Sequence, residues 1–155
     1  ALEAWRRGES PPLDARRAFA HPAPRIAAGV KLAELGAHAA LDLSDGLGGD
    51  ARHLAAASGV ALEVELERLP VAPVALAEAQ RSGIDAAPFA AEGGEDYEVL
   101  VALPPLFGVR DAAELTHACG VPLTAIGVVK PGAGVRFSLH GVDVPLKGFD
   151  HFALG

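Results

Sequence analysis

Apolar residues occupy the even positions from Val60 to Leu66, and glutamates occupy positions 63, 65 and 67. Successive side chains of a β-strand point to opposite faces, so this period of two predicts a strand with one buried face and one solvated face. Residues 39–41 form a short apolar run, which is typical of a buried strand. Residues 96–103 are more evenly apolar, and we predict that they form a central strand.

Helices are indicated by composition and by the signals at their ends. Proline is favoured in the first turn of a helix, and glycine just after the last turn, where it adopts the left-handed conformation at low cost. Helix-forming stretches in this chain end at Gly36, Gly59, Gly83 and Gly120. We therefore predict helices over residues 13–20, 24–35, 50–57 and 73–81, and one from the Pro104–Pro105 pair to Gly120.

The end of the chain is richer in strands. Residues 121–129 read as a strand, residues 130–134 as a glycine-rich turn, and residues 135–139 as the hairpin partner of that strand. Strands and helices alternate first, and strands dominate later. This order predicts an α/β (α+β) fold, a mixed-sheet sandwich of two or three layers, in preference to a doubly wound parallel sheet.

Composition narrows the functional classes. The chain has 155 residues, of which 50% are hydrophobic, so it has enough material for a real core and is not disordered. Its net charge of −7 and the lack of a basic run argue against a nucleic-acid partner. It contains no apolar run of roughly 20 residues and no signal-peptide pattern, so we expect no membrane association and a cytoplasmic protein.

The segment Asp42-Leu43-Ser44-Asp45-Gly46-Leu47 carries the most informative chemistry. It places two carboxylates and a hydroxyl where a buried strand opens into a helix. The unpaired N–H groups and the dipole of a helix start favour an anion there, and a hard cation such as Mg²⁺ is needed between the aspartates and a phosphate. Metal-bridged phosphate is therefore one interpretation of this segment.

A simpler interpretation is also open, because serine and aspartate are preferred helix N-caps and glycine beside them forms an ordinary turn. Two details favour the functional interpretation. Gly46, Gly48 and Gly49 crowd the first helical turn, where each costs about 1 kcal/mol relative to alanine, so they indicate close backbone approach or flexibility. Asp42 precedes the cap and is not needed for it. The chain lacks a P-loop, so any phosphoryl chemistry must use a less common scaffold.

Three segments together resemble the thiamine-monophosphate kinase family, which belongs to the superfamily of aminoimidazole ribonucleotide synthetase. They are Asp42-Leu43-Ser44-Asp45-Gly46-Leu47, Gly93-Gly94-Glu95-Asp96-Tyr97-Glu98 and Gly148-Phe149-Asp150-His151-Phe152, in the order of the family. The resemblance spans residues 25–152. It implies the fold of the C-terminal domain of aminoimidazole ribonucleotide synthetase.

The resemblance also implies roles for single residues. Asp42 and Asp45 would each ligate Mg²⁺, with Asp45 as the catalytic aspartate, and Ser44 would contact the phosphates of ATP. Glu95 and Phe149 would face thiamine monophosphate, whose cationic thiazolium ring and aminopyrimidine suit an aromatic face and a carboxylate. Taken alone, Glu95 could equally cap a strand, and Phe149 could anchor the core.

The resemblance finally implies an incomplete enzyme. Residues 1–22 are interpreted as a linker and first helix that follow an absent N-terminal domain, and residues 23–155 as the carboxyl-terminal α/β domain. We expect a phosphotransferase that makes thiamine diphosphate from ATP and thiamine monophosphate, a homodimer formed through the absent domain, and no activity of this chain alone. The alternatives are another ATP-dependent synthetase of the superfamily and a non-catalytic regulatory module with the same fold.

Overall fold

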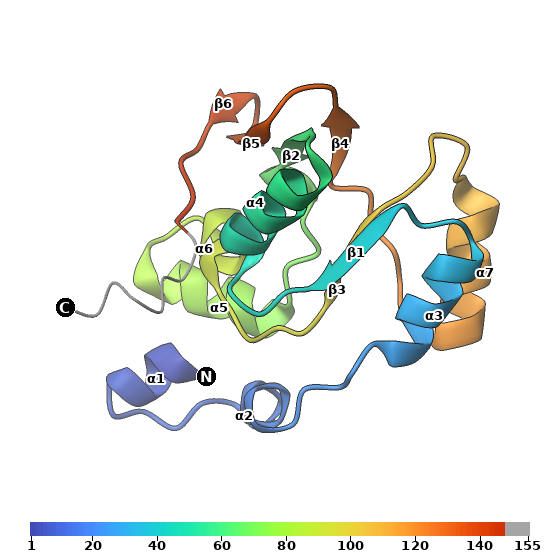
Figure 1. Cartoon of the computed structure of the whole chain (residues 1–155). Coiled ribbons are helices and arrows are strands. Elements are labelled where there is room, and N and C mark those ends of the chain that lie inside the picture. Colours follow the sequence, from blue (N-terminus) through green and yellow to red (C-terminus); the bar gives the residue numbers. More distant parts are fainter. Residues whose placement is uncertain (148–155) are drawn as a thin grey trace.

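The computed structural model describes residues 1–147 of the chain. The described part is a mixture of helices and strands, which confirms the predicted mixed α/β fold (Figure 1). The helices are α1 (Leu2–Arg6), α2 (Leu13–Ala20), α3 (Ile26–Glu34), α4 (Leu47–Ser58), α5 (Pro73–Ser82), α6 (Ala86–Glu92) and α7 (Val109–Cys119), with a 3₁₀ turn at Leu66–Arg68. The strands are β1 (Ala39–Asp42), β2 (Ala61–Glu65), β3 (Val99–Ala102), β4 (Gly127–Lys130), β5 (Gly134–Leu139) and β6 (Val142–Asp143).

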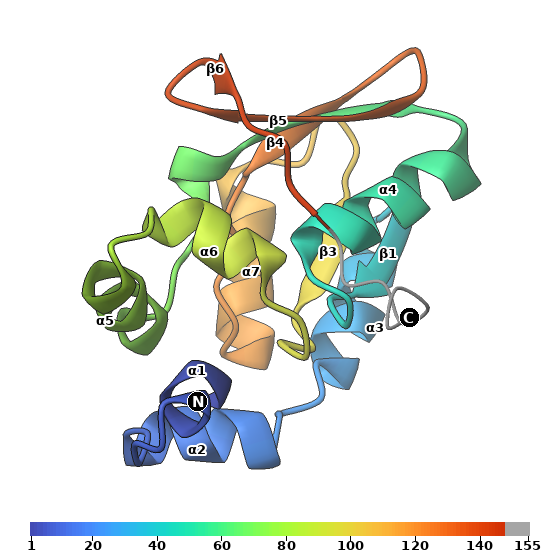
Figure 2. The same ribbon diagram turned by 90° about the vertical axis from the view of Figure 1, so that its left-hand side faces the viewer.

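The strands form two separate sheets. The larger sheet has the order β4-β2-β5-β6, in which β2 and β5 are parallel and the other neighbours are antiparallel. The smaller sheet consists of β1 and β3, paired antiparallel so that Asp42 lies opposite Val99. Helix α4 lies between the two sheets, where it packs against β1 on one side and against β5 and β2 on the other (Figures 1 and 2).

The main core forms around α4. The alternation predicted for residues 60–66 is confirmed, because Leu62 and Val64 of β2 are buried while the glutamates at positions 63 and 65 are exposed. The buried side chains come from α4, β2, β5 and the segments that flank them: Leu47, Ala51, Leu54, Ala55, Leu62, Val64, Leu66, Ala91, Phe137 and Leu146. Ala39 and Leu41 of β1 pack against this cluster and so join the smaller sheet to the larger one.

A second, smaller core lies on the other side of β1 and β3, where α3 packs against α7. It is built from Ala28, Leu32 and Leu115, with Val99 and Val101 of β3 packed against it. Leu100 of β3 packs against the main core, and Val99 and Val101 pack against the second core on the opposite face. The strand β3 is therefore apolar on both faces. The prediction of a central strand over residues 96–103 was wrong in two respects. The strand β3 spans only Val99–Ala102, and within residues 1–147 its one strand neighbour is β1.

Glycines end the helices as predicted. Gly59, Gly83 and Gly120 follow α4, α5 and α7 in the left-handed conformation. The predicted start of α7 at Pro104 was wrong, because the helix begins at Val109. The side chain of Asp111 accepts a hydrogen bond from the N–H of Gly108 at 2.7 Å and so fixes the start there.

The predicted hairpin of residues 121–129 with residues 135–139 was also wrong. Of the predicted first strand, only the part from Gly127 is a strand, β4 (Gly127–Lys130). It does not pair with β5, because β2 lies between them. Residues 121–123 instead remain irregular, and Leu123 packs against the second core. The short helix α6 was not predicted, since its seven residues include a proline and show no helical period.

The N-terminal helices are attached to the body of the molecule by charged groups. Arg7, just after α1, forms an ion pair with Glu78 of α5 at 2.5 Å, and Glu9 pairs with Arg81 at the end of α5. Trp5 packs edge-on against Phe19 of α2, with 5.3 Å between the ring centroids. Figure 2 shows α1 and α2 together below α5. None of the helices within residues 1–147 has the length and apolar character needed to cross a membrane.

Candidate functional site

The candidate site lies at one end of the β1–β3 pair. Because these strands are antiparallel, the loop that leaves β1 after Asp42 lies beside the loop that enters β3 before Val99. We call residues 42–46 the Asp42 loop and residues 93–98 the Glu95 loop. Two of the three motif segments found in the sequence are thus brought together by strand pairing.

Backbone hydrogen bonds join the two loops directly. The N–H of Leu43 donates to the carbonyl of Glu98, and the N–H of Tyr97 donates to the carbonyl of Leu43, both at 2.8 Å. The N–H of Glu95 donates to the carbonyl of Ser44, also at 2.8 Å. These bonds continue the β1–β3 ladder beyond the ends of the strands, so Ser44 and Glu95 are held side by side.

One glycine in each loop, Gly46 and Gly94, is required by this contact. A Cβ atom on Gly94 would lie 2.6 Å from the carbonyl oxygen of Ser44, and one on Gly46 would lie 2.8 Å from the carbonyl oxygen of Gly93. A Cβ on Gly48 would lie 2.7 Å from the carbonyl oxygen of Lys147. The prediction of close backbone approach is therefore confirmed for Gly46 and Gly48.

Asp50 holds the Asp42 loop from the other side, a role that was not predicted from the sequence. Its side chain is 3% exposed, and its Oδ2 accepts hydrogen bonds from the N–H groups of Ser44 and Asp45, each at 3.0 Å. These two N–H groups lie before the helix start, and an internal carboxylate accepts both of them. Burial raises the pKa of Asp50, and the two N–H groups act in the opposite direction. The only sequence signal was an acidic residue in a first helical turn, which is common at exposed helix ends.

The Glu95 loop has unusual backbone geometry. Glu95 and Tyr97 have φ angles of +64° and +52°, in the left-handed region that side chains other than glycine rarely adopt. Such conformations persist where surrounding contacts enforce them, and they gather at functional sites. Here the enforcing contacts are the hydrogen bonds of the same two residues to the Asp42 loop.

Charge is concentrated at the far end of the Glu95 loop. Glu98 forms a two-pronged ion pair with Arg25, at 2.9 Å from Nε and 2.5 Å from Nη2 of the arginine. Asp96 keeps contact with solvent, yet desolvation by its surroundings, together with the nearby charge of Glu98, raises the pKa of Asp96 to about 6. The loop therefore carries one carboxylate whose charge is balanced by an arginine, that of Glu98, and one whose pKa is raised, that of Asp96.

The predicted site residues fall into three groups. Ser44 and Asp45 are half-buried in the Asp42 loop, and exposed Glu95 is bonded to that loop through its backbone. Asp42 is exposed at the end of β1, two residues before Ser44. Phe149 lies outside the described residues.

No cluster of carboxylates in the two loops is large enough to surround a magnesium ion alone, and such an ion would need further ligands. Within residues 1–147, no group of three or more histidine, cysteine, aspartate or glutamate side chains is arranged to hold a metal ion. Mg²⁺ in phosphoryl-transfer sites is commonly bound through one or two carboxylates together with phosphates and water. The Asp42 loop contains two carboxylates, those of Asp42 and Asp45, which is the number that such a site uses.

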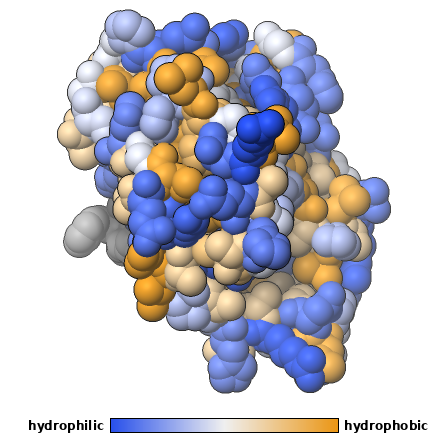
Figure 3. All heavy atoms as spheres, turned by 90° about the vertical axis from the view of Figure 1, so that its right-hand side faces the viewer, coloured by the Kyte–Doolittle hydropathy of each residue, from blue (hydrophilic) through white to orange (hydrophobic). Residues whose placement is uncertain are grey.

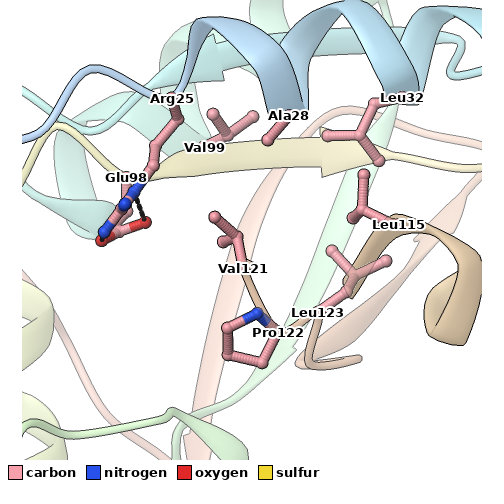
Figure 4. Close-up of a pocket in the computed structure, with 9 residues that line it drawn as sticks. All are labelled: Arg25, Ala28, Leu32, Glu98, Val99, Leu115, Val121, Pro122 and Leu123. Atoms are coloured by element: carbon pink, nitrogen blue, oxygen red, sulfur yellow. Dashed lines mark hydrogen bonds and ion pairs between the residues drawn. The ribbon is translucent and has the colours of Figure 1, made fainter. Parts of the chain in front are cut away.

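A small cavity lies beside the loops but is not a substrate site. It lies between α3, β3 and α7, with a volume of about 50 Å³, whereas ligand pockets usually span about 300–1,000 Å³. Figure 4 shows Arg25 and Glu98 joined at one end of it and apolar side chains around the rest. The ion pair thus anchors the end of the Glu95 loop to the start of α3.

The outer face over α3 and α7 also gives no sign of a ligand site. Ile26, Val30 and Val109 are exposed there. Figure 3 shows hydrophobic residues interspersed with hydrophilic ones over this side of the molecule. We therefore place the candidate site at the two loops.

Comparisons with known proteins show the family to which this chain is similar. Residues 4–140 match the family described as AIR synthase related protein, C-terminal domain. The thiamine-monophosphate kinase of Haemophilus influenzae is 40% identical over 138 residues, which cover 84% of this chain and 40% of that protein. The chain thus spans less than half the length of this curated relative.

Solved structures give the same picture. The thiamine-monophosphate kinase of Stenotrophomonas maltophilia K279a superposes with a TM-score of 0.75 at 33% identity, over 92% of this chain and 46% of that one. A structure described as AaThiL complexed with AMPPCP and TMP superposes with a TM-score of 0.76 at 30% identity, over 97% of this chain and 46% of that one.

Proposed function

This chain belongs to the family of AIR synthase related proteins, as their C-terminal domain, and from that premise we propose that it is the carboxyl-terminal part of a thiamine-monophosphate kinase. The contact between the Asp42 loop and the Glu95 loop carries the proposal. It places the segment expected to bind metal and phosphate beside Glu95, the residue expected to bind the substrate. The kinase name of its relatives and the ATP analogue bound in one of them support this choice.

The proposed reaction is phosphoryl transfer from ATP to thiamine monophosphate. A phosphate oxygen of thiamine monophosphate bonds to the γ-phosphorus of ATP, the bond from that phosphorus to the bridging oxygen breaks, and ADP and thiamine diphosphate leave. Both reactants are anionic, so the site must neutralise charge and align the two phosphates. Mg²⁺, when bound, supplies that neutralisation.

Each predicted residue has a role in this proposal. Asp42 and Asp45 hold Mg²⁺, and Asp45 is the aspartate on which turnover depends most. The hydroxyl of Ser44 donates a hydrogen bond to an ATP phosphate. Glu95 and Phe149 hold the thiamine group, the carboxylate facing its cationic ring.

The setting of the enzyme follows from the same premise. We propose a cytoplasmic homodimer whose interface and remaining metal ligands come from an additional N-terminal domain. The division of this chain into residues 1–22 and 23–155 stays a prediction. ATP and thiamine monophosphate are the proposed partners, and neither nucleic acid nor membrane is included.

The test uses the complete protein, with production of ADP and thiamine diphosphate followed by chromatography. We expect Asp45→Asn to abolish Mg²⁺-dependent formation of thiamine diphosphate. The matched control is Asp85→Asn, since Asp85 is exposed and makes no side-chain cap on α6. Normal turnover by Asp45→Asn would overturn the metal role.

The same assay separates the two alternatives. ADP formed with a different acceptor, and none with thiamine monophosphate, would indicate another synthetase of the superfamily. The absence of Mg²⁺-dependent nucleotide binding in the complete protein would indicate a regulatory module.

A further inference from the structure

Asp50 is the one charged residue that is buried among residues 1–147. A buried carboxylate is costly unless hydrogen bonds and favourable charges surround it. The carboxylate of Asp50 accepts hydrogen bonds from the N–H groups of Ser44 and Asp45, each at 3.0 Å. It also lies in the first turn of α4, where the helix dipole favours negative charge. Two backbone N–H groups and the helix dipole therefore stabilise this buried carboxylate.

These hydrogen bonds do not serve as a helix cap. A capping side chain would bond to the free N–H groups of its own helix, and Gly46, the residue at the N-cap of α4, has no side chain to do so. Asp50 instead points back to Ser44 and Asp45, which lie outside the helix. The bonds thus fix the Asp42 loop relative to α4.

The loop is held on its other side by the Glu95 loop. The carbonyl of Ser44 accepts the N–H of Glu95 at 2.8 Å, while the N–H of Ser44 donates to Asp50. Both polar groups of the Ser44 backbone are therefore engaged by opposite neighbours. Because the backbone sets the direction of each Cα–Cβ bond, the side chains of Ser44 and Asp45 are aimed by Asp50.

We propose that Asp50 is a positioning residue, which holds the hydroxyl of Ser44 and the carboxylate of Asp45 in the arrangement that takes up a magnesium–nucleotide complex. Asp50 makes no contact with the reactants and acts through the Asp42 loop. The inference rests on the proposed function and assigns a part in it to a residue buried behind the site.

The test compares three variants of the complete protein. Asp50→Ala removes the acceptor. Asp50→Asn retains one carbonyl oxygen of similar shape, and this is sufficient because both N–H groups bond to the same oxygen, Oδ2. Leu115→Ala is the control for lost stability, since Leu115 is buried in the second core, at the end of the small cavity opposite Glu98 (Figure 4).

The first measurement needs neither metal nor activity. Hydrogen–deuterium exchange of residues 43–46 should be about tenfold faster in Asp50→Ala than in the unchanged protein, because two charge-assisted hydrogen bonds are lost. Asp50→Asn should retain most of the protection. Exchange in Asp50→Ala no faster than in Leu115→Ala would overturn the inference.

The second measurement is the Mg²⁺ concentration that gives half-maximal turnover. Residues that orient metal ligands typically change metal affinity by about 10–100-fold when removed, and we expect a rise of that size in Asp50→Ala. Asp50→Asn should restore the value, and Leu115→Ala should leave it unchanged even where its melting temperature is lower. An unchanged Mg²⁺ requirement in Asp50→Ala would reduce Asp50 to a stability residue and overturn the proposal.

The two proposals fail in different ways. If the unchanged protein shows no Mg²⁺-dependent phosphoryl transfer, the proposed function fails. The exchange experiment then still decides whether Asp50 orders the loop.

Discussion

Replacing Gly46 by alanine tests the contact between the two loops most directly. Gly46 has φ +87° and ψ 155°, a backbone conformation that is almost confined to glycine. Its added Cβ would also meet three carbonyl oxygens at the end of α6, those of Gly93, Glu92 and Ala91 at 2.8, 3.2 and 3.3 Å. The substitution therefore combines backbone strain with steric overlap.

The expected loss of stability follows from these two causes. Backbone strain of this type costs about 1–3 kcal/mol. Overlap with fixed backbone atoms costs about 1–3 kcal/mol more. The central expectation is about 4 kcal/mol, which corresponds to a fall in melting temperature of about 8–16 °C at about 2–4 °C per kcal/mol for a domain of this size.

Gly59→Ala is the matched control at the opposite end of α4. Gly59 has φ +63°, and a Cβ placed on it would meet nothing within 4 Å. Only the left-handed conformation is penalised, partly offset by the smaller entropy of the unfolded alanine chain, so we expect a loss of about 1 kcal/mol.

Thermal unfolding of both variants, followed by circular dichroism, provides the assay. Gly46→Ala should melt well below Gly59→Ala, and it should also lose turnover because the two loops are pushed apart. Equal melting temperatures for the two variants would refute the packing argument.

Three further outcomes are expected. Asp45→Asn should abolish turnover while its melting temperature stays within a few degrees of that of the unchanged protein, as checked by the kinase assay and thermal unfolding; a large fall in melting temperature would indicate a structural role. Leu115→Ala should reduce the free energy of unfolding by about 2–5 kcal/mol in denaturant titrations, because it opens a cavity between α3 and α7. Asp96→Asn should raise the melting temperature above pH 6 and leave it unchanged below about pH 4, with melting curves at both pH values as the check. The folded-state pKa of about 6 exceeds the ordinary 3.8, so the folded protein binds more protons between these values and loses stability as the pH rises through them; we expect a small gain because the residue is solvent-exposed.

Local features of the chain could be predicted well from the sequence. The alternation from Val60 to Leu66 and the glycines after α4, α5 and α7 depend on neighbouring residues, and the structure confirms them. The start of α7 was misplaced because the proline pair looked like a helix start, whereas the side chain of Asp111 fixes the start at Val109.

Features that depend on distant residues could not be predicted. The burial of Asp50 arises from the packing of α4 between two sheets, and nothing near it in the sequence distinguishes it from an exposed acidic residue. The pairing of the Asp42 loop with the Glu95 loop depends on the register of β1 with β3, which are separated by more than 50 residues. The residue types at the strand-to-helix junction indicated Asp42, Ser44 and Asp45, the resemblance added Glu95 and Phe149, and the geometry added Asp50.

The position of β2 between β4 and β5 has a consequence for how the chain folds. Residues 131–133 connect β4 to β5 and cross the end of β2, a distance of two interstrand spacings or about 10 Å. The crossing is close, since a Cβ on Gly132 would lie 3.4 Å from the Cβ of Ala61. Segments so close in sequence would form a hairpin fastest, since loop closure is cheapest for short loops. A β4–β5 hairpin excludes β2, so wherever that local pairing forms first we expect it to open before the native strand order is complete.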